Sequence, residues 1–193
     1  MNSRIRIEKI ETLSQGWASL KRYTLTYTRR DGRSETQIRA VHDHGHGAAI
    51  LPYDAERGTV LLVRQFRLPV FLNGGTGDII EVCAGLLDGD PPEVCAKREA
   101  KEELGYCITN FRQVASTFMT PGAVTERLTM FLADYRIGDK INDGGGDAAE
   151  GEDIEVLEMP FTAALAMLRD GAIIDAKTVM LLMFLARELT LKR

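Results

Sequence analysis

Three glutamates are crowded into one and a half turns of a predicted helix. Glu99, Glu102 and Glu103 all lie in the stretch AKREAKEELGY. On a helix, residues three and four apart are neighbours, so a basic residue at either spacing can neutralise the charge of a glutamate. Arg98 lies four residues before Glu102 and suits this role, whereas no basic residue lies at these offsets from Glu99 or Glu103. Two carboxylates on this helix therefore lack a predicted partner.

A divalent cation would account for this pair. Two like charges at this spacing cost about 0.2 to 0.5 kcal/mol in an isolated helix, and a bound cation would reverse the sign. Carboxylate oxygens favour Mg²⁺, Mn²⁺ or Ca²⁺ over a metal that seeks thiolates. On spacing alone, a solvated acidic face is the simpler interpretation. Gly85 and the loop DGDPP favour the metal, because they bring a turn and a helix N-terminus, where phosphate binds, beside the acids.

The surrounding sequence predicts an α/β fold that positions this helix. Pro91 and Pro92 suit a first helical turn and Gly105 suits the residue after the last turn, so the helix lies between them. Apolar runs bounded by turn residues predict strands at 48–54, 59–69, 78–83, 111–119, 127–137 and 154–160. Further helices are predicted at 161–171 and 175–192.

Two other segments complete the predicted organisation. YTLTYT and ETQIRAV, joined by a turn at Asp31 and Gly32, predict a β-hairpin. A hairpin is too small to hold a core alone, so it should pack on the rest of the chain or on a second copy. Residues 138–153 are rich in glycine and acids, and predict a long mobile loop with a function.

Composition excludes several classes of protein. A net charge of -4 and a pI near 5.5 argue against a nucleic-acid polymer as partner. The three cysteines, Cys83, Cys95 and Cys107, form no Cys-x-x-Cys pair and predict neither a disulfide framework nor a zinc site. VMLLMFLA, the most apolar segment, is far shorter than the roughly 20 residues of a membrane span. With no apolar run suited to a signal peptide, we expect a cytoplasmic protein without a membrane partner.

The acidic stretch resembles the box of the Nudix hydrolases. That box runs Gly, five residues, Glu, seven residues, then Arg-Glu-hydrophobe-any-Glu-Glu-any-Gly-hydrophobe. Residues 98–106 fit its second half, while the first half is one residue short and has Asp90 where the family has Glu. The resemblance covers nearly the whole chain and is nearest to the GDP-mannose pyrophosphatase branch, related to the ADP-ribose pyrophosphatases. It rests on the segments VRQFR, NGG, EVCAGLLD, TPGAVTE, EDIEVLEMPF and DAKTV.

This resemblance implies a fold and an activity. The fold would be a Nudix α/β/α sandwich over residues 46–193, with a small antiparallel β extension over residues 1–45 that packs across a homodimer. The reaction would be Mg²⁺-dependent hydrolysis of the pyrophosphate bond of a nucleoside diphosphate sugar, with Mn²⁺ as the alternative metal. GDP-mannose would give GMP and mannose 1-phosphate. The alternatives are ADP-ribose or another sugar nucleotide as substrate, and a nucleotide-sugar sensor without turnover.

The resemblance also implies the site residues. The metal ligands would be the carbonyl of Ala84 and the carboxylates of Glu99, Glu103 and Glu152. Glu103 and Glu152 would be the catalytic residues, with Glu150 and Asp153 as rivals of Glu152. The positions that match substrate contacts are Trp17, Arg39, Arg67, Gly85, Leu86, Glu126 and Lys177.

Some of these residues have a second interpretation. Arg67 and Lys177 suit the charge of a phosphate. Trp17 either stacks on a base or packs against the protein. His42, His44 and His46 alternate and would face one way in a strand, which suits a transition-metal site or, more simply, a solvated strand end.

Overall fold

The computed structural model describes residues 4–191, except for the side chain of Glu150. These residues form two compact units. The N-terminal unit contains the described residues up to His46 together with Phe118–Arg127. The core unit contains Gly47–Thr117 and the described residues from Leu128 onward.

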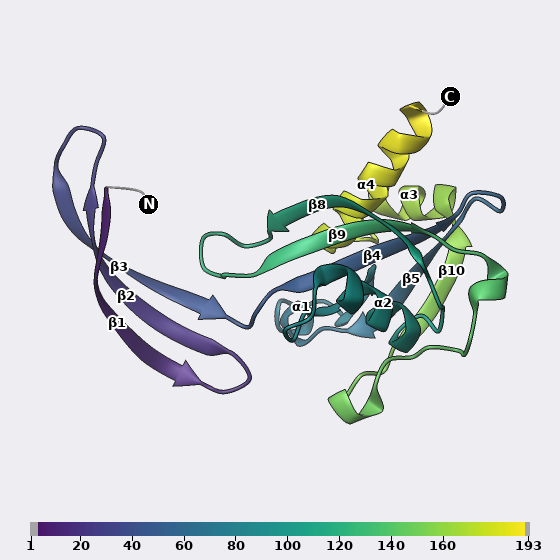
Figure 1. Ribbon diagram of the computed structural model, residues 1–193, viewed down its shortest axis with the longest axis horizontal. Coiled ribbons are helices and arrows are strands. Elements are labelled where there is room, and N and C mark those ends of the chain that lie inside the picture. Colours follow the sequence, from purple (N-terminus) through teal and green to yellow (C-terminus); the bar gives the residue numbers. More distant parts are fainter. Residues whose placement is uncertain (1–3, 192–193) are drawn as a thin grey trace. The chain divides into compact units, whose positions relative to one another are not determined.

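The N-terminal unit is built on an antiparallel sheet of three strands, β1 (Ile5–Gln15), β2 (Ser19–Thr28) and β3 (Ser34–Asp43), in that order (Figure 1). The hairpin predicted from YTLTYT and ETQIRAV is confirmed as β2 and β3, and Gly32 has the positive φ of 88° that its turn requires. Strand β1 was not predicted. Its pairing with β2 shifts register between Ile7 and Lys9 and again between Thr12 and Ser14, which breaks the alternation that identifies a strand.

The segment 118–127 joins the N-terminal unit through contacts with the end of β3. Val124 pairs with His42 in an isolated parallel bridge. The Thr125 hydroxyl donates to Asp43 Oδ1 at 2.7 Å, and the backbone N–H of Arg127 donates to His46 Nδ1 at 3.1 Å. This loop and the sheet are therefore one unit although 75 residues or more separate them in the sequence.

A mixed sheet of seven strands forms the centre of the core unit. Its main order is β10-β5-β4-β9-β8, with β6 beside β5 and β7 beside β4. Strand β4 pairs in parallel with β9 and antiparallel with β5 and β7. The strands are β4 (Gly47–Asp54), β5 (Thr59–Phe66), β6 (Asp78–Glu81), β7 (Cys83–Leu86), β8 (Asn110–Phe118), β9 (Arg127–Asp134) and β10 (Glu155–Pro160).

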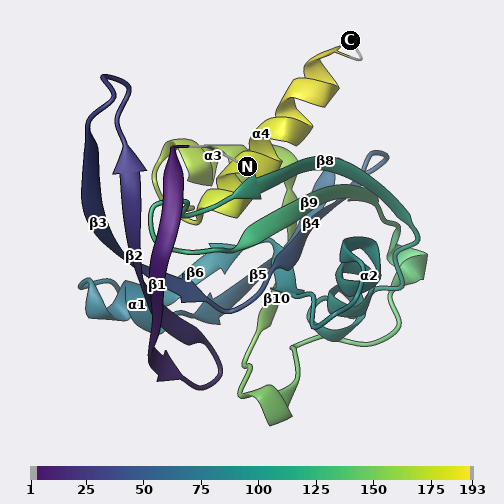
Figure 2. The same cartoon turned by 60° about the vertical axis from the view of Figure 1, so that its left-hand side comes forward.

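Helices cover both faces of this sheet (Figures 1 and 2). They are α1 (Leu68–Leu72), α2 (Pro92–Glu102), α3 (Phe161–Arg169) and α4 (Ala176–Leu191), with short 3₁₀ turns at Ile137–Asp139 and Ala148–Glu150. Ala48 and Ile50 of β4 join the core cluster that contains Ala96 and Ala100 of α2. The other residues of β4 are buried as well, apart from half-buried Tyr53, and α4 contacts this strand. The predicted α/β/α sandwich is confirmed.

The long segment after β9 is held against the C-terminal end of α2. The N–H groups of Gly145 and Gly146 donate to the carbonyls of Glu103 and Glu102 at 2.9 and 3.0 Å. They satisfy carbonyls that a helix leaves free at its end. A side chain at Gly144 would place its Cβ 2.3 Å from the Glu103 carbonyl oxygen, so only glycine allows this approach. The glycines of this segment therefore fix the backbone that carries Glu103.

Among the described residues, none of the helices combines the length and apolar character that a membrane crossing requires.

Candidate functional site

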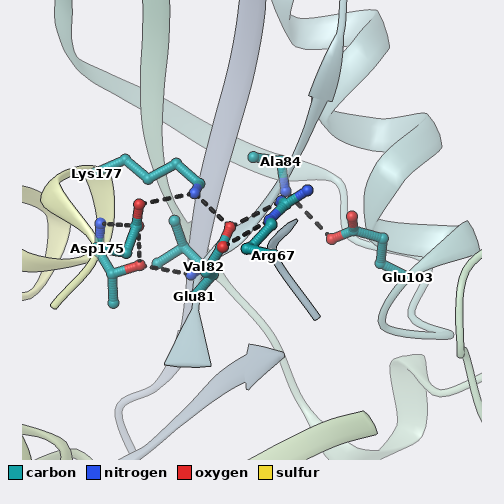
Figure 3. Close-up of polar contacts among 8 residues, drawn as sticks. Arg67, Glu81, Val82, Ala84, Glu103, Asp175 and Lys177 are labelled. Carbon is teal, nitrogen blue, oxygen red and sulfur yellow. Dashed lines mark hydrogen bonds and ion pairs between the residues drawn. The ribbon is translucent and has the colours of Figure 1, made fainter. Parts of the chain in front are cut away.

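Strand β7 and the end of α2 bring Ala84 and Glu103 together. The backbone N–H of Ala84 donates to Glu103 Oε2 at 3.2 Å (Figure 3). Glu103 is only 1% exposed. Burial raises its pKa to about 8, and the charges of Glu99 and Glu152 add to this rise, while hydrogen bonds from Cys83 and Ala84 oppose it. The other two acids predicted as metal ligands, Glu99 and Glu152, therefore lie within electrostatic range of Glu103.

Arg98 contacts both of the acids beside it. Its Nη1 lies 3.2 Å from Glu102 Oε2, which confirms the predicted pair. The same Nη1 lies 2.8 Å from Glu99 Oε1, so the prediction that Glu99 lacks a basic neighbour is wrong. Adjacent side chains on a helix point apart, but the long arginine turns back and also donates from Nη2 to the Leu86 carbonyl at 2.9 Å. Helical offsets alone could not include this contact with β7.

Gly85 leaves the space that the Glu99 carboxylate occupies. A Cβ at position 85 would lie 1.9 Å from Glu99 Oε1 and 2.2 Å from its carboxyl carbon. Since Glu99 is 6% exposed, its carboxylate has little freedom to move aside. Gly85 and Leu86, both predicted to contact substrate, thus also shape the site through their backbone, because the Leu86 carbonyl accepts from Arg98 and from the Cys95 thiol.

The donor set fits a hard divalent cation. Among the described residues, no three His, Cys, Asp or Glu side chains converge into a ready-made metal cluster. Glu99 instead pairs with Arg98, Glu103 accepts from Ala84, and Glu152 Oε2 accepts from the Asp147 N–H at 2.8 Å. The fit rests on chemistry: the available donors are carboxylate oxygens, and a buried carboxyl beside two like charges is stabilised by a bound cation.

A second cluster places two cations on one buried carboxylate (Figure 3). Arg67 Nε and Nη2 donate to the two oxygens of Glu81 at 2.8 and 2.9 Å. Lys177 Nζ lies 2.5 Å from Glu81 Oε2 and 3.0 Å from Asp175 Oδ1. Arg67 and Lys177, predicted to contact substrate, are therefore brought together by residues far apart in the chain.

Asp175 also fixes the start of α4. Its Oδ2 accepts from the N–H and the hydroxyl of Thr178 at 2.9 and 2.6 Å. The Thr178 hydroxyl in turn accepts from the Val82 N–H at 2.8 Å, which ties the helix to the sheet. Sequence reasoning missed Glu81 and Asp175. The available signal for Glu81 was a single acid inside the apolar run IIEVC. The signal for Asp175 was an aspartate at a helix start, three residues before Thr178.

Arg67 connects the cluster around Glu81 with the acids around Glu103. The hydrogen bond to Glu81 is the largest cause that raises the pKa of Arg67; burial opposes it, and the charges of Glu81, Glu103 and Asp175 raise the pKa further. Figure 3 shows Arg67 bound to Glu81, and the charge of Glu103 acts on the same guanidinium. A cationic group suited to phosphate is thus next to acids suited to a metal, an arrangement that fits chemistry on a phosphate ester or anhydride.

Three of the predicted substrate residues lie in the N-terminal unit. Trp17 is 79% exposed and stacks on His44, with ring centroids 5.6 Å apart and planes 9° apart. Arg39 is exposed and donates to Gln37 Oε1 and to the Ile38 carbonyl, both at 2.9 Å. Glu126 is half-buried in the loop 118–127. All the other predicted site residues belong to the core unit.

The buried acid predicts how stability depends on pH. Without divalent cations, the stability of the native chain relative to Glu103→Gln should fall as pH rises from about 4.5 to about 8, because the folded pKa lies above the ordinary value of 4.5. Folded Glu103 holds its proton in this window and unfolded Glu103 does not, so raising pH favours unfolding by at most about 1.4 kcal/mol per unit. Urea unfolding in EDTA at several pH values measures this. The prediction would be contradicted if the free energy of unfolding changed with pH in the same way for the two proteins.

Comparison with known proteins finds two family models along the chain. Residues 43–182 match the family model described as NUDIX domain, and residues 4–42 match the model described as GDP-mannose pyrophosphatase NudK N-terminal domain. A GDP-mannose pyrophosphatase of Pectobacterium atrosepticum is 48% identical over 183 residues, covering 94% of both chains. One of Yersinia enterocolitica is 47% identical and covers 93% of this chain and 95% of its own.

A solved structure shares the fold. It is titled "Crystal structure of ADP compounds hydrolase" and superposes with a TM-score of 0.73 at 19% identity, covering 97% of this chain and 94% of its own. At this identity the likeness concerns the fold alone. The family model that spans most of the chain and the relative at 48% identity confirm the predicted family: the protein is a member of the Nudix hydrolases.

Proposed function

We propose that this protein hydrolyses the pyrophosphate bond of GDP-mannose to give GMP and mannose 1-phosphate. The observation that carries the proposal is the position of Arg67, which binds buried Glu81 and lies within electrostatic range of the acid Glu103. A pyrophosphate carries negative charge that suits a cation, and its hydrolysis requires an activated water that suits acids and a metal. The relatives named as GDP-mannose pyrophosphatases support the choice of sugar nucleotide.

Nudix hydrolases generally need divalent metal ions, and we propose Mg²⁺ for this one, with Mn²⁺ as the alternative. The Ala84 carbonyl and the carboxylates of Glu99, Glu103 and Glu152 would hold it. When bound, the ion would offset charge on the phosphate oxygens and make water more acidic. One of the two catalytic acids, Glu103 or Glu152, would accept the proton of the attacking water. The effect of Glu152 on the pKa of Glu103 supports its choice over Asp153, while the side chain of the other rival, Glu150, lies outside the described residues.

The remaining residues would bind the substrate. Arg67 and Lys177 would receive the phosphate groups, and the backbone at Gly85 and Leu86 would line the same place. Trp17 would stack on the base, which its exposure of 79% leaves room for. Arg39 and Glu126, in the same unit as Trp17, would contact the nucleoside or the sugar.

We also propose that the N-terminal sheet forms part of a homodimer interface. A three-stranded sheet holds little core by itself, and this one leaves apolar side chains of two strands in solvent. They are Ile5, Ile7, Ile10, Leu13 and Ile38, each at least 43% exposed. The protein would act in the cytoplasm on a small nucleotide, without a nucleic-acid polymer or a membrane as partner.

A substrate panel tests the proposed function. The protein is incubated with Mg²⁺ and separately with GDP-mannose, ADP-ribose and UDP-glucose, and the products are identified by chromatography. We expect GDP-mannose to be cleaved with the highest kcat/KM. A higher kcat/KM for ADP-ribose would contradict the proposal and identify ADP-ribose as the preferred substrate. Binding without cleavage of any of the three would instead indicate a nucleotide-sugar sensor.

A further inference from the structure

We propose that Glu81 is a positioning residue that holds Arg67 and Lys177 at the separation at which both receive the phosphate groups of the substrate. This inference rests on the proposed function and adds a residue to its machinery. It comes from the polar cluster of Figure 3, in which one carboxylate contacts both cations.

The first argument is the use of both carboxylate oxygens. Arg67 binds Oε1 and Oε2 through Nε and Nη2, a two-point contact that fixes the plane of the guanidinium as well as its position. Lys177 shares Oε2. A single carboxylate therefore fixes the position of one cation relative to the other.

The second argument is the difference in exposure. The Glu81 side chain is 2% exposed, whereas the side chains of Lys177 and Arg67 are 14% and 41% exposed. An anion from solvent can reach the guanidinium but not the carboxylate behind it. Glu81 is thus placed to act through Arg67 and Lys177 and not to touch substrate.

The third argument is where the three residues come from. Arg67 follows β5, Glu81 ends β6, and Lys177 lies in the first turn of α4. Arg67 is 14 residues and Lys177 is 96 residues from Glu81. No local sequence pattern sets the distance between the two cations, which would repel each other without the shared carboxylate.

The charges of the cluster support this arrangement. Two cations, Arg67 and Lys177, face two acids, Glu81 and Asp175, so the cluster is neutral as it stands. Asp175 contacts only Lys177 of these two cations and is also engaged by Thr178. Glu81 is therefore the residue through which Arg67 is oriented.

Glu81→Gln tests the proposal in the full-length protein. We expect kcat/KM for GDP-mannose with Mg²⁺ to fall about 100-fold, the size of effect that a displaced binding group causes. Asp54→Asn is the matched control: Asp54 is 5% exposed and accepts from Arg57 Nε at 2.7 Å, but it lies at the end of β4, outside the cluster of Figure 3. This control should lower the melting temperature and leave kcat/KM near the native value. A native kcat/KM in Glu81→Gln would overturn the proposal.

A mutant cycle separates positioning from stability. In a background that carries both Arg67→Ala and Lys177→Ala, Glu81→Gln should lower kcat/KM by less than about threefold, because both groups it positions are gone. A full second loss of about 100-fold would overturn the proposal. If Glu81→Gln does not fold, Glu81→Asp keeps the charge on a shorter side chain that cannot hold both cations, and it should lower kcat/KM at least tenfold. A native value there would overturn the proposal equally.

Binding of GDP distinguishes this inference from the proposed function. If the native protein cleaves no sugar nucleotide, the proposed function fails. Calorimetry with GDP still tests whether Glu81 positions Arg67 and Lys177 for phosphate binding. The native protein should bind GDP at least tenfold more tightly than Glu81→Gln, while Asp54→Asn should bind like the native protein. Equal binding by native and Glu81→Gln protein, or no binding by the native protein, would overturn the inference.

Discussion

Glu103→Gln should lower GDP-mannose turnover by about 10²- to 10³-fold while the fold survives. Glutamine has the shape of glutamate, and its amide oxygen can still accept from the Ala84 N–H, so the contact between β7 and α2 persists. What it lacks is the negative charge that would hold a divalent cation and accept a proton. Because Glu103 is 1% exposed, removing this charge also removes the cost of burying it.

The control lies on the same helix. Glu102→Gln changes a carboxylate whose side chain is 44% exposed and which pairs with Arg98. A single surface pair is worth at most about 1 kcal/mol, so this variant should retain native kcat and stability. Steady-state kinetics and circular dichroism of the two variants measure this. Comparable kcat in Glu103→Gln and the native protein would remove Glu103 from the catalytic site.

Metal binding can be tested without turnover. A ligand that binds the folded state raises the melting temperature by mass action. Mg²⁺ should therefore raise the melting temperature of the native protein and of Glu102→Gln, and should have little effect on Glu103→Gln. An equal rise in all three proteins would place the ion elsewhere.

Gly85→Ala should have the second large effect. The added Cβ would lie 1.9 Å from Glu99 Oε1, far closer than two atoms can approach, so either the carboxylate or the backbone of β7 must move. Both belong to the proposed metal site, which the Ala84 carbonyl shares. We expect kcat/KM to fall about 100-fold, as displacement of a catalytic group by about 1 Å produces. Steady-state kinetics with GDP-mannose and Mg²⁺ measure the loss.

Gly138→Ala is the matched control for this substitution. A Cβ at position 138 would meet nothing within 4 Å, and the residue does not have the positive φ that strains other side chains. It should leave kcat/KM and the melting temperature unchanged. Native activity in Gly85→Ala would show that the Glu99 carboxylate is not needed where the structure places it.

Much of the fold follows from the sequence because its patterns are local. Pro92 and Gly105 bound α2 as predicted, since proline suits a first helical turn and Gly105 adopts a positive φ of 77° just beyond the last one. Alternation and turn residues likewise gave the hairpin of β2 and β3. Strand β1 was not predicted because two register shifts disrupt its alternation.

The acids of the site could also be predicted, but their partners could not. The spacing of Glu99 and Glu103 indicated a metal, and both lie in the candidate site. The contact of Arg98 with Glu99 depends on how α2 packs beside β7, which helical offsets do not include. The close approach of Gly85 to Glu99 has the same origin.

By itself, the sequence determined the family, the order of most of the elements and the acidic face of α2, because these depend on residue types at short spacings. Only the tertiary structure decided which charges meet. Glu81 binds Arg67 and also Lys177, which lies 96 residues away in the sequence. The packed sheet and α4 exclude water around this carboxylate, and the two cations offset the free-energy cost of burying its charge. The pKa of Glu103 has the same cause, since burial and neighbouring charge exist only in the folded chain.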